Sequence, residues 1–171
     1  MRYRHHENDQ FNLEYQEFVR PLYIKLKSHL QPSACGLDFG AGASSSMAHL
    51  MSEAGFTVKL YDPFFHNDLS VLNERYDFIY ACEVVEHLFD PVSEFKKIRK
   101  MLNENGVFAF MTSLFHPSLK FDDWYYRKDP THVGFFSART CEAIARQCGF
   151  RLINQSDLAD PKNRVVIFQA S

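Results

Sequence analysis

The stretch "GLDFGAGASS", residues 36–45, places Asp38 two residues before Gly40, the first of two closely spaced glycines. An apolar run at residues 34–39 leads into these glycines, as a buried strand would. The apolar residues that follow, up to residue 54, recur at helical spacing. Glycines at such a strand-to-helix turn allow a ligand to approach the main chain closely. The stretch therefore predicts a ligand-binding turn at the end of a buried strand, with an acid beside it.

Strand and helix patterns alternate on either side of this turn. Strands are expected at residues 34–39, 56–61, 76–82 and 107–112, followed by a closing pair at 151–156 and 164–169. Helices are expected after the glycine turn, from Pro91 to Asn105-Gly106 with Asp90 as the cap, and from Ser137 to Gly149. The alternation predicts one α/β domain, 1–171, with a doubly wound, mostly parallel sheet, helices on both faces and a C-terminal antiparallel strand pair.

Two segments do not fit the alternation. Residues 1–32 are expected to form a helical cap of two short helices, because Pro21 interrupts their apolar stripe. Residues 113–136 are irregular and rich in aromatic side chains, and a structureless connection of this length is usually a binding loop or lid. We call residues 113–136 the aromatic loop and expect it to cover the substrate.

The overall composition excludes several classes of partner. A formal charge of -2 and a pI near 6.4 give no global basic field, so nucleic acid is not expected. No stretch approaches the roughly 18 to 20 apolar residues of a membrane span, and no apolar signal core follows the start. We therefore expect a cytoplasmic protein without a membrane span. The four cysteines lack the spacing of a zinc site, and no metal is expected.

The acid before the glycines bears on the kind of ligand. In a dinucleotide-binding GxGxxG turn a pyrophosphate lies on the helix N-terminus, but here the third glycine position holds Ser45. The charge of Asp38 would oppose a nearby phosphate by roughly 1 to 4 kcal/mol. A cationic ligand suits the acid and the glycines together better than a phosphate does. An NAD(P)-dependent oxidoreductase is therefore kept only as the alternative function.

The acid and the alternating glycines resemble the first motif of the class I S-adenosylmethionine-dependent methyltransferases, with Ser44 in place of that family's frequent third glycine. Three further segments resemble the family in the same order: "KLYDP" (59–63), "YDFIYACEVVEHLFDP" (76–91) and "MLNENGVFAFMTS" (101–113). The segment "WYYRKDPTHVGFFS" (124–137) resembles the small bacterial methyltransferases grouped with ubiquinone-biosynthesis methylases. The resemblance implies a Rossmann-like fold, although residues 63–76 leave little room for the family's second helix and third strand.

The resemblance also implies S-adenosylmethionine as the cofactor and assigns residues to it. Asp38 would lie near the methionine ammonium, Gly40 and Gly42 would let the main chain approach, and Asp62 would accept hydrogen bonds from the ribose hydroxyls. The other cofactor-binding candidates are Pro63 and Phe64 as an adenine wall, Cys82, Glu83 and His87. Phe64 could equally pack in the core, Cys82 could be buried without a role, and His87 could be a structural hydrogen-bonding residue.

The methyl acceptor is expected under the aromatic loop. His132 and His116 are the candidates for a catalytic base, since histidine titrates near neutral pH, although His132 could instead bind loop backbone. Trp124, Tyr125 and Tyr126 could stack on a planar or apolar acceptor, or form a small core of their own.

We therefore predict an S-adenosylmethionine-dependent methyltransferase that acts on a small molecule at oxygen or carbon. The alternatives are the oxidoreductase and a non-catalytic, methyltransferase-like binding module. The sequence indicates neither the identity of the acceptor nor the oligomeric state.

Overall fold

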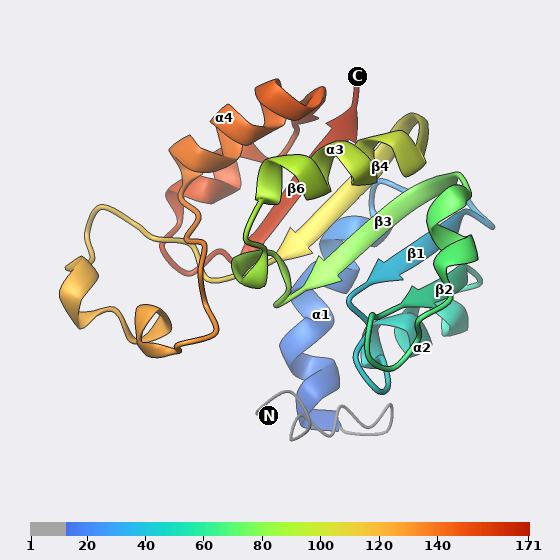
Figure 1. Ribbon diagram of the computed structural model, residues 1–171, viewed down its shortest axis with the longest axis horizontal. Helices are drawn as coiled ribbons and strands as arrows, with labels where there is room; N and C mark the ends of the chain where they lie inside the picture. The colour runs from blue at the N-terminus through green and yellow to red at the C-terminus, as the bar shows by residue number, and fades with distance from the viewer. Residues whose placement is uncertain (1–12) are drawn as a thin grey trace.

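A six-stranded mixed sheet forms the centre of the computed structural model, which describes residues 13–171. In the order β2-β1-β3-β4-β6-β5, its strands are Thr57–Tyr61, Cys35–Phe39, Tyr76–Cys82, Leu102–Met111, Val165–Ala170 and Phe150–Leu152. Strands β2, β1, β3 and β4 are parallel, and β6 runs antiparallel to both β4 and β5 (Figure 1). The mostly parallel sheet and its C-terminal antiparallel pair are thus confirmed. Residues 1–12 of the expected helical cap lie outside the described part of the chain.

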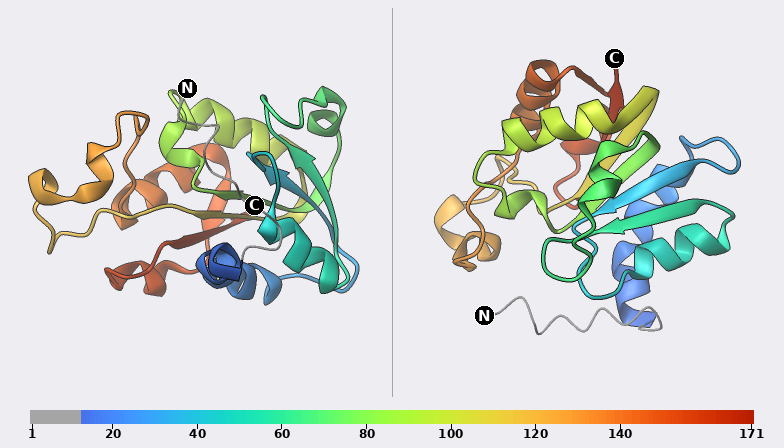
Figure 2. Two further views of the ribbon diagram at one scale, coloured as in Figure 1. Left: turned by 90° about the horizontal axis from the view of Figure 1, so that it is seen from below. Right: turned by 45° about the vertical axis from the view of Figure 1, so that its right-hand side comes forward.

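Helices cover both faces of the sheet (Figures 1 and 2). One face carries α1, Leu13–Lys27, and α2, Ser46–Glu53, while the other carries α3, Pro91–Met101, and α4, Ala138–Cys148. Successive side chains of a strand point to opposite faces. In β4, Val107 and Ala109 accordingly pack with α1 and α2, whereas Phe108 and Phe110 pack with α3 and α4. None of the described helices has the length and apolar character that a membrane span requires.

Phenylalanine rings fill the layer between the sheet and helices α3 and α4. The ring centroid of Phe95 in α3 lies 5.2 Å from that of Phe108 and 6.2 Å from that of Phe136. Phe136 is the last residue of the aromatic loop, and its carbonyl accepts a hydrogen bond from Phe115 N at 2.7 Å. These contacts close the loop at its base, while its middle extends away from the sheet (orange in Figure 1).

Helix α1 corrects the expectation of two short helices. It runs without a break from Leu13 to Lys27 and contains Pro21, which removes one helical hydrogen bond. Pro21 lies on the exposed side, whereas Val19, Leu22 and Leu26 are buried against the sheet. Because apolar packing along that buried side outweighs the local cost of proline, a single helix forms.

The end of α3 also differs from the expectation. The helix ends just before Leu102, where β4 begins, so Asn105-Gly106 lies within the strand. Tyr76 of β3 pairs with Leu102, but Phe78 pairs with Val107, so the register shifts between these two pairs. Asn105, with a φ of 59°, lies in the resulting bulge. The turn signal in the sequence therefore marks a bulge and not a helix end.

Strand β5 is shorter than the expected 151–156, because a side chain replaces main-chain pairing at its end. Asn154 Oδ1 accepts a hydrogen bond from Ile167 N at 2.9 Å, and Asn154 Nδ2 donates to Val165 O at 2.9 Å. A 3₁₀ helix, Gln155–Ala159, follows directly.

The connection between β2 and β3 is as short as the sequence predicts. It contains a 3₁₀ helix at Leu69–Asn73, which Asp68 caps by accepting a hydrogen bond from Ser70 N at 2.9 Å. No further strand follows in this connection, so β2 forms an edge of the sheet.

Candidate functional site

The parallel strands β1, β2, β3 and β4 end at one edge of the sheet. Sheets of this kind bind ligands in the crevice outside the carboxyl ends of their strands. The glycine turn follows β1, Asp62 follows β2, Glu83 follows β3 and Thr112 follows β4. Residues that come from separate segments of the sequence are thus gathered at one edge.

Gly40 occupies a position that only glycine fits. Its φ is 89°, and a Cβ atom there would lie 2.5 Å from Cγ2 of Val84. Gly40 N and Ala41 N donate hydrogen bonds to Tyr61 O at 2.8 and 3.1 Å, which fixes the turn against the end of β2. Gly42 also has a positive φ, 65°. The turn therefore carries no side chain at either glycine, as close approach of a ligand to the main chain requires.

Ser45 joins helix α2 to the buried acid Asp38. Its hydroxyl oxygen accepts a hydrogen bond from Ala48 N at 3.0 Å, and its hydroxyl donates to Asp38 Oδ2 at 2.5 Å. The Tyr80 hydroxyl lies beside Asp38 but does not form a hydrogen bond of regular geometry. Burial raises the pKa of the Asp38 carboxyl to about 7, although Ser45 and Tyr80 oppose the shift. A cation beside Asp38 would favour its charged form, so the acid suits a positively charged ligand group.

A cavity of about 30 Å³ lies between the glycine turn and α1. Its lining includes Asp38, Gly40 and Ser44 from the turn, Cys82 from the end of β3 and Tyr15 from α1. A water-sized group needs roughly 10 to 15 Å³ of such volume. The cavity therefore admits a group the size of an ammonium, and its acidic wall suits a positive charge. The predicted contact of Asp38 with the methionine ammonium stays a prediction.

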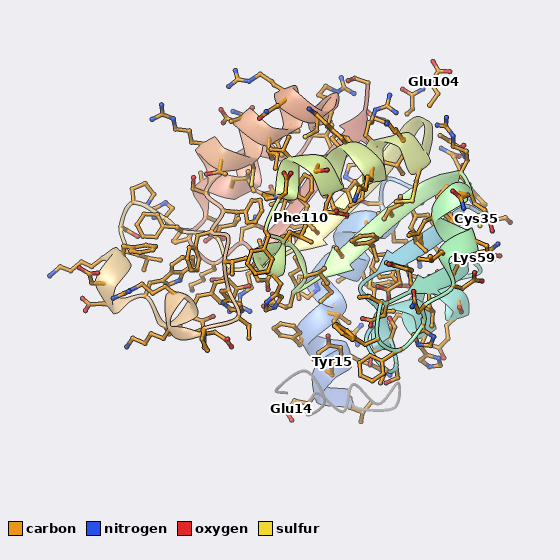
Figure 3. All side chains as sticks on the ribbon, viewed as in Figure 1. Glu14, Tyr15, Cys35, Lys59, Glu104 and Phe110 are labelled. Atoms are coloured by element: carbon orange, nitrogen blue, oxygen red, sulfur yellow. The ribbon has the colours of Figure 1, made fainter. Side chains whose placement is uncertain are left out.

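Tyr15 is a site residue that the sequence pattern does not identify. The sequence places it in a helical stripe that is typical of core packing, whereas in the structure it lies near the carboxyl ends of the strands (Figure 3). Its hydroxyl interacts with the Cys82 thiol, and burial raises the pKa of both groups. Both groups are therefore neutral near pH 7. Only the docking of α1 across the sheet, which local periodicity does not encode, brings Tyr15 to the cavity.

Asp62 ties the end of β2 to the glycine turn. Its Oδ2 accepts a hydrogen bond from Gly42 N at 3.0 Å, and its Oδ1 accepts from Phe64 N at 2.8 Å and Phe65 N at 3.1 Å. A carboxylate has about four acceptor positions, so these three bonds leave little capacity for ribose hydroxyls. Asp62 therefore holds the main chain of the glycine turn and of the segment after β2. Its contact with the ribose stays a prediction.

Pro63 and Phe64 lie on the surface beyond Asp62. The Phe64 side chain is 74% exposed, so the alternative that it packs in the core is wrong. An exposed aromatic ring at the end of β2 is compatible with the predicted adenine wall, which stays a prediction.

Two glutamates and a tyrosine form a carboxylate cluster at the end of β3. The Tyr126 hydroxyl donates to Glu86 Oε1 at 2.5 Å and lies 3.2 Å from Glu83 Oε2. Thr112 Oγ1 donates to Glu86 Oε2 at 3.1 Å. Because the Tyr126 hydroxyl has one proton, its contact with Glu83 is a hydrogen bond whenever Glu83 itself carries a proton. We call Glu83, Glu86, Tyr126 and Thr112 the carboxylate cluster.

Several features distinguish Glu83 from the other members of this cluster. Its φ of 53° is unusual for a residue other than glycine, and unusual backbone of this kind gathers at functional sites. Burial, followed by the charge of Glu86, raises the pKa of Glu83 to about 7, while Arg164 opposes the shift. Glu83 Oε1 is buried and has no hydrogen-bond partner among residues 13–171. A carboxylate with these properties can take up a proton near neutral pH, a role that the sequence assigns to histidine.

His87 and His132 lie beside the cluster, with ring centroids 4.9 Å apart. His132 Nδ1 lies 2.7 Å from Tyr126 O and His87 Nδ1 lies 2.9 Å from Thr131 O, so each Nδ1 donates to a carbonyl, and in a neutral ring Nε2 bears the lone pair. Ligand atoms of Glu86, His87 and His132 all lie within 4.8 Å of one another, an arrangement that could hold a divalent cation. The sequence does not indicate this grouping because its members come from two distant segments.

His116 has different surroundings. Its Nδ1 forms hydrogen bonds with Ser118 Oγ at 2.7 Å and Ser118 N at 3.1 Å, within an exposed turn. None of its hydrogen bonds in the described structure joins it to the carboxylate cluster, unlike His132.

The three aromatic residues predicted to bind substrate have separate environments. Trp124 is 5% exposed and packs with Phe115 at 5.6 Å and Phe135 at 5.5 Å, as a small core of the loop would. Tyr126 is equally buried and belongs to the carboxylate cluster, in which its hydroxyl donates to Glu86. Tyr125 is 60% exposed, and its hydroxyl accepts a hydrogen bond from Arg164 Nη2 at 2.6 Å.

Comparisons with known proteins identify the family and agree with the fold. A family model described as "Methyltransferase domain" matches residues 10–155. The chain is similar in structure to 1,6-didemethyltoxoflavin-N1-methyltransferase of Burkholderia thailandensis, with a TM-score of 0.64 and 16% identity over 90% of this chain and 78% of that one. It is also similar to magnesium protoporphyrin IX methyltransferase of Synechocystis PCC 6803, with a TM-score of 0.57 and 13% identity over 95% of this chain and 86% of that one. Both of these structures contain S-adenosylhomocysteine. None of the curated proteins matches the sequence significantly.

Proposed function

Because the chain belongs to the methyltransferase-domain family and is a class I S-adenosylmethionine-dependent methyltransferase, we propose that it methylates a small molecule at oxygen or carbon, with Glu83 as the general base. The family match spans most of the chain and replaces the oxidoreductase alternative. The proposal for the acceptor atom rests on one observation, the buried Oε1 of Glu83, which has no hydrogen-bond partner within the described residues 13–171.

The cofactor supplies an electrophilic methyl group on a sulfonium centre. Asp38 would face its ammonium group, Gly40 and Gly42 would admit it close to the main chain, and Asp62 would hold the glycine turn and approach the ribose. The Cys82 thiol and the Tyr15 hydroxyl line the same cavity, and both are neutral near pH 7 because their pKa values are raised. They would exclude water from the cavity without adding charge, which strengthens the effect of Asp38.

The acceptor atom determines whether a base is needed. A neutral amine attacks through its existing lone pair, whereas a hydroxyl or an acidic carbon must lose a proton. Glu83 lies at the end of β3, its pKa is raised to about 7, and none of the described residues donates a hydrogen bond to its Oε1. It is therefore charged in much of the protein near neutral pH. Such a group is suited to remove that proton. His132 is the second candidate, since its Nε2 bears a lone pair, and its backbone bond would orient the ring.

Transfer of a labelled methyl group tests the reaction. The protein is incubated with methyl-labelled S-adenosylmethionine and a panel of phenols, carbon acids and amines, and products are identified by mass spectrometry. Label on oxygen or carbon supports the proposal, and label confined to nitrogen contradicts it. Calorimetric binding of S-adenosylhomocysteine without transfer to any compound would support the non-catalytic binding module instead.

The substitution Glu83→Gln tests the base. It is expected to lower kcat by about 10²- to 10⁴-fold while the affinity for S-adenosylhomocysteine stays within about twofold. Glu104→Gln is the matched control, because Glu104 is an exposed carboxylate far along β4 from the strand end. If Glu83→Gln weakens cofactor binding and leaves kcat unchanged, Glu83 is a cofactor-binding residue, as the sequence first indicated.

A further inference from the structure

We infer that the methyl acceptor carries a carboxylate or phosphate group, which binds in a cleft beside the aromatic loop. The identity of this ligand as the acceptor rests on the proposed function, whereas the cleft follows from the structure alone. The cleft has a volume of about 500 Å³. Sites for small molecules typically measure roughly 300 to 1,000 Å³, so the cleft can hold a ring together with a charged group.

The cleft lies between the aromatic loop and the segment that leads into β6. Trp124 and Tyr125 line it from the loop, and Asn163 and Arg164 line it from the other side. The carbonyl of Arg164 accepts a hydrogen bond from Thr112 N at 3.0 Å. Thr112 belongs to the carboxylate cluster, so a main-chain hydrogen bond joins this cluster to Arg164 in the wall of the cleft.

The charged residues that line the cleft are mostly positive. Lys120, Lys162 and Arg164 are accompanied by one carboxylate, that of Asp123. Neither lysine ammonium forms an ion pair or a hydrogen bond with any residue between 13 and 171. The chain as a whole has a formal charge of -2, so this local excess of positive charge is not a general property of its surface. An anionic ligand would therefore meet two lysine ammonium groups that have no carboxylate partner among residues 13–171.

Arg164 is the cation best placed to bind an oxyanion. Its Nη2 donates to the Tyr125 hydroxyl at 2.6 Å, and its guanidinium lies 5.8 Å from the ring centroid of Phe18. These two contacts set the orientation of a group with five N–H donors, of which most remain for a ligand. A guanidinium binds carboxylate or phosphate through parallel hydrogen bonds. Arg164 lines the cleft, and its charge also acts on Glu83, whose pKa it lowers.

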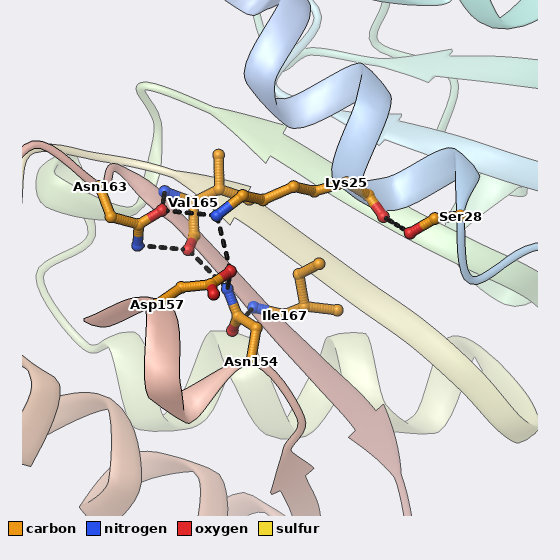
Figure 4. A network of polar contacts seen from close by, with 7 residues as sticks. All are labelled: Lys25, Ser28, Asn154, Asp157, Asn163, Val165 and Ile167. Carbon is orange, nitrogen blue, oxygen red and sulfur yellow. Dashed lines mark hydrogen bonds and ion pairs between the residues drawn. The ribbon is translucent and has the colours of Figure 1, made fainter. Parts of the chain in front are cut away.

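A polar network holds this wall of the cleft in place (Figure 4). Lys25 of α1 donates to Asn163 Oδ1 at 2.9 Å and to Asp157 Oδ2 at 2.7 Å, and Asn163 Nδ2 donates to Val165 O at 2.9 Å. Both chain neighbours of Arg164 are thereby fixed. A wall that is ordered before binding loses less entropy when the ligand enters.

The wall opposite Arg164 indicates what kind of group the uncharged part of the ligand is. The rings of Trp124 and Tyr125 form part of it, together with the apolar side chains of Leu114 and Leu119. Aromatic walls favour planar or apolar groups. A ligand whose anion binds Arg164 would place its ring against these side chains and present a hydroxyl or carbon acid toward Glu83.

The test uses the fluorescence of Trp124, which is the only tryptophan in the chain. Benzoate, phenyl phosphate, benzyl alcohol and inorganic phosphate are titrated into the full-length protein without cofactor. Benzoate or phenyl phosphate is expected to change the emission saturably and to bind at least tenfold more tightly than benzyl alcohol. Raising the salt concentration should reduce this preference. The better of the two anions distinguishes a carboxylate acceptor from a phosphate acceptor.

Substitutions then locate the anion. Arg164→Gln should remove the preference for the charged ligand, whereas Arg146→Gln, at an exposed arginine on α4, should leave it unchanged. Lys120→Gln with Lys162→Gln provides a second test if Arg164→Gln proves unstable, and should reduce the preference at least threefold. Equal binding of benzyl alcohol and benzoate, or an anion preference that survives all these substitutions, would overturn the inference. These titrations contain no methyl donor, so their outcome is separate from that of the methyl-transfer assay.

Discussion

The Tyr126 hydroxyl donates a hydrogen bond to Glu86 Oε1 at 2.5 Å, across 40 positions of the sequence. Glu86 is completely buried, and a buried carboxylate is costly unless it is hydrogen-bonded. The aromatic loop therefore supplies a hydrogen-bond donor to a buried carboxyl group that follows β3, and this hydrogen bond in turn fixes the loop. Together with the closure at Phe136, this bond makes the loop a structured wall of the site.

The substitution Tyr126→Phe removes this hydroxyl while keeping the ring. We expect the free energy of unfolding to fall by about 1–3 kcal/mol, because a buried carboxylate oxygen loses its donor. Urea unfolding followed by circular dichroism measures the change. Tyr23→Phe serves as the control, since the Tyr23 hydroxyl accepts only an exposed hydrogen bond from Lys27 and its loss should cost less than about 0.5 kcal/mol. Equal effects of the two substitutions would mean that Tyr126 does not hold the loop.

The substitution Gly40→Ala tests the glycine turn. Gly40 has a φ of 89° and would place a Cβ atom 2.5 Å from Val84 Cγ2, so the turn must shift. We expect the affinity for S-adenosylhomocysteine, measured by calorimetry, to fall at least tenfold, or by about 1.4 kcal/mol.

Gly55→Ala is the matched control for Gly40→Ala. Gly55 also has a φ of 89°, but a Cβ atom there would meet no atom within 4 Å. Both variants should lose stability through backbone strain, by roughly 1–2 kcal/mol. Only Gly40→Ala should lose cofactor affinity, and a similar loss in both variants would show that global strain and not the turn is responsible.

The two roles of Asp62 can be separated with a modified ligand. Asp62→Ala should weaken binding of S-adenosylhomocysteine by about 1–3 kcal/mol, since charge-assisted hydrogen bonds are lost. If Asp62 contacts the ribose, the loss should be smaller for 2′-deoxy S-adenosylhomocysteine, which lacks one hydroxyl. A loss of the same size for both ligands would assign Asp62 to the glycine turn alone. Asp68→Ala, which removes another carboxylate that caps a turn, should leave both affinities unchanged.

The sequence predicts most of the fold because the deciding signals are local. The apolar runs, the cap residues Asp90 and Ser137 and the left-handed Gly149 each determine a short segment, and the structure contains all of them. The errors occur where distant contacts outweigh a local rule. Pro21 stays inside a helix because the opposite side of that helix is buried, and Asn105 lies in a bulge because β4 pairs with β3 on both sides of it.

Less of the candidate site than of the fold can be predicted from the sequence, because more of the site depends on contacts between distant segments. The glycine turn and Asp62 lie in motifs of a few residues, so sequence spacing identifies them. Tyr15, Tyr126 and Arg164 come from three distant segments and reach Glu83 or its neighbours only through the packing of α1, the aromatic loop and β6. The raised pKa of Glu83 depends on burial and on Glu86, and neither can be read from the residue itself.

Glu83 should make the stability of the protein depend on pH. Its pKa is raised from 4.5 to about 7 in the folded state, so between these values the folded protein binds more protons than the unfolded chain. Stability therefore falls as pH rises through this window, and the contribution of Glu83 is complete below about pH 4.5 and lost above about pH 7. The full change has a magnitude of about 3 kcal/mol.

Urea unfolding of the wild type and of Glu83→Gln at pH 5 and pH 8 measures this contribution. The variant lacks the titrating group, so it should be more stable relative to the wild type at pH 8 than at pH 5. Asp38, whose pKa is also raised to about 7, is present in both proteins and cancels in the difference. Glu104→Gln should show no such dependence, because Glu104 is exposed. A stability difference between wild type and Glu83→Gln that is the same at both pH values would mean that Glu83 is charged throughout, and would remove the physical basis for its role as a base near neutral pH.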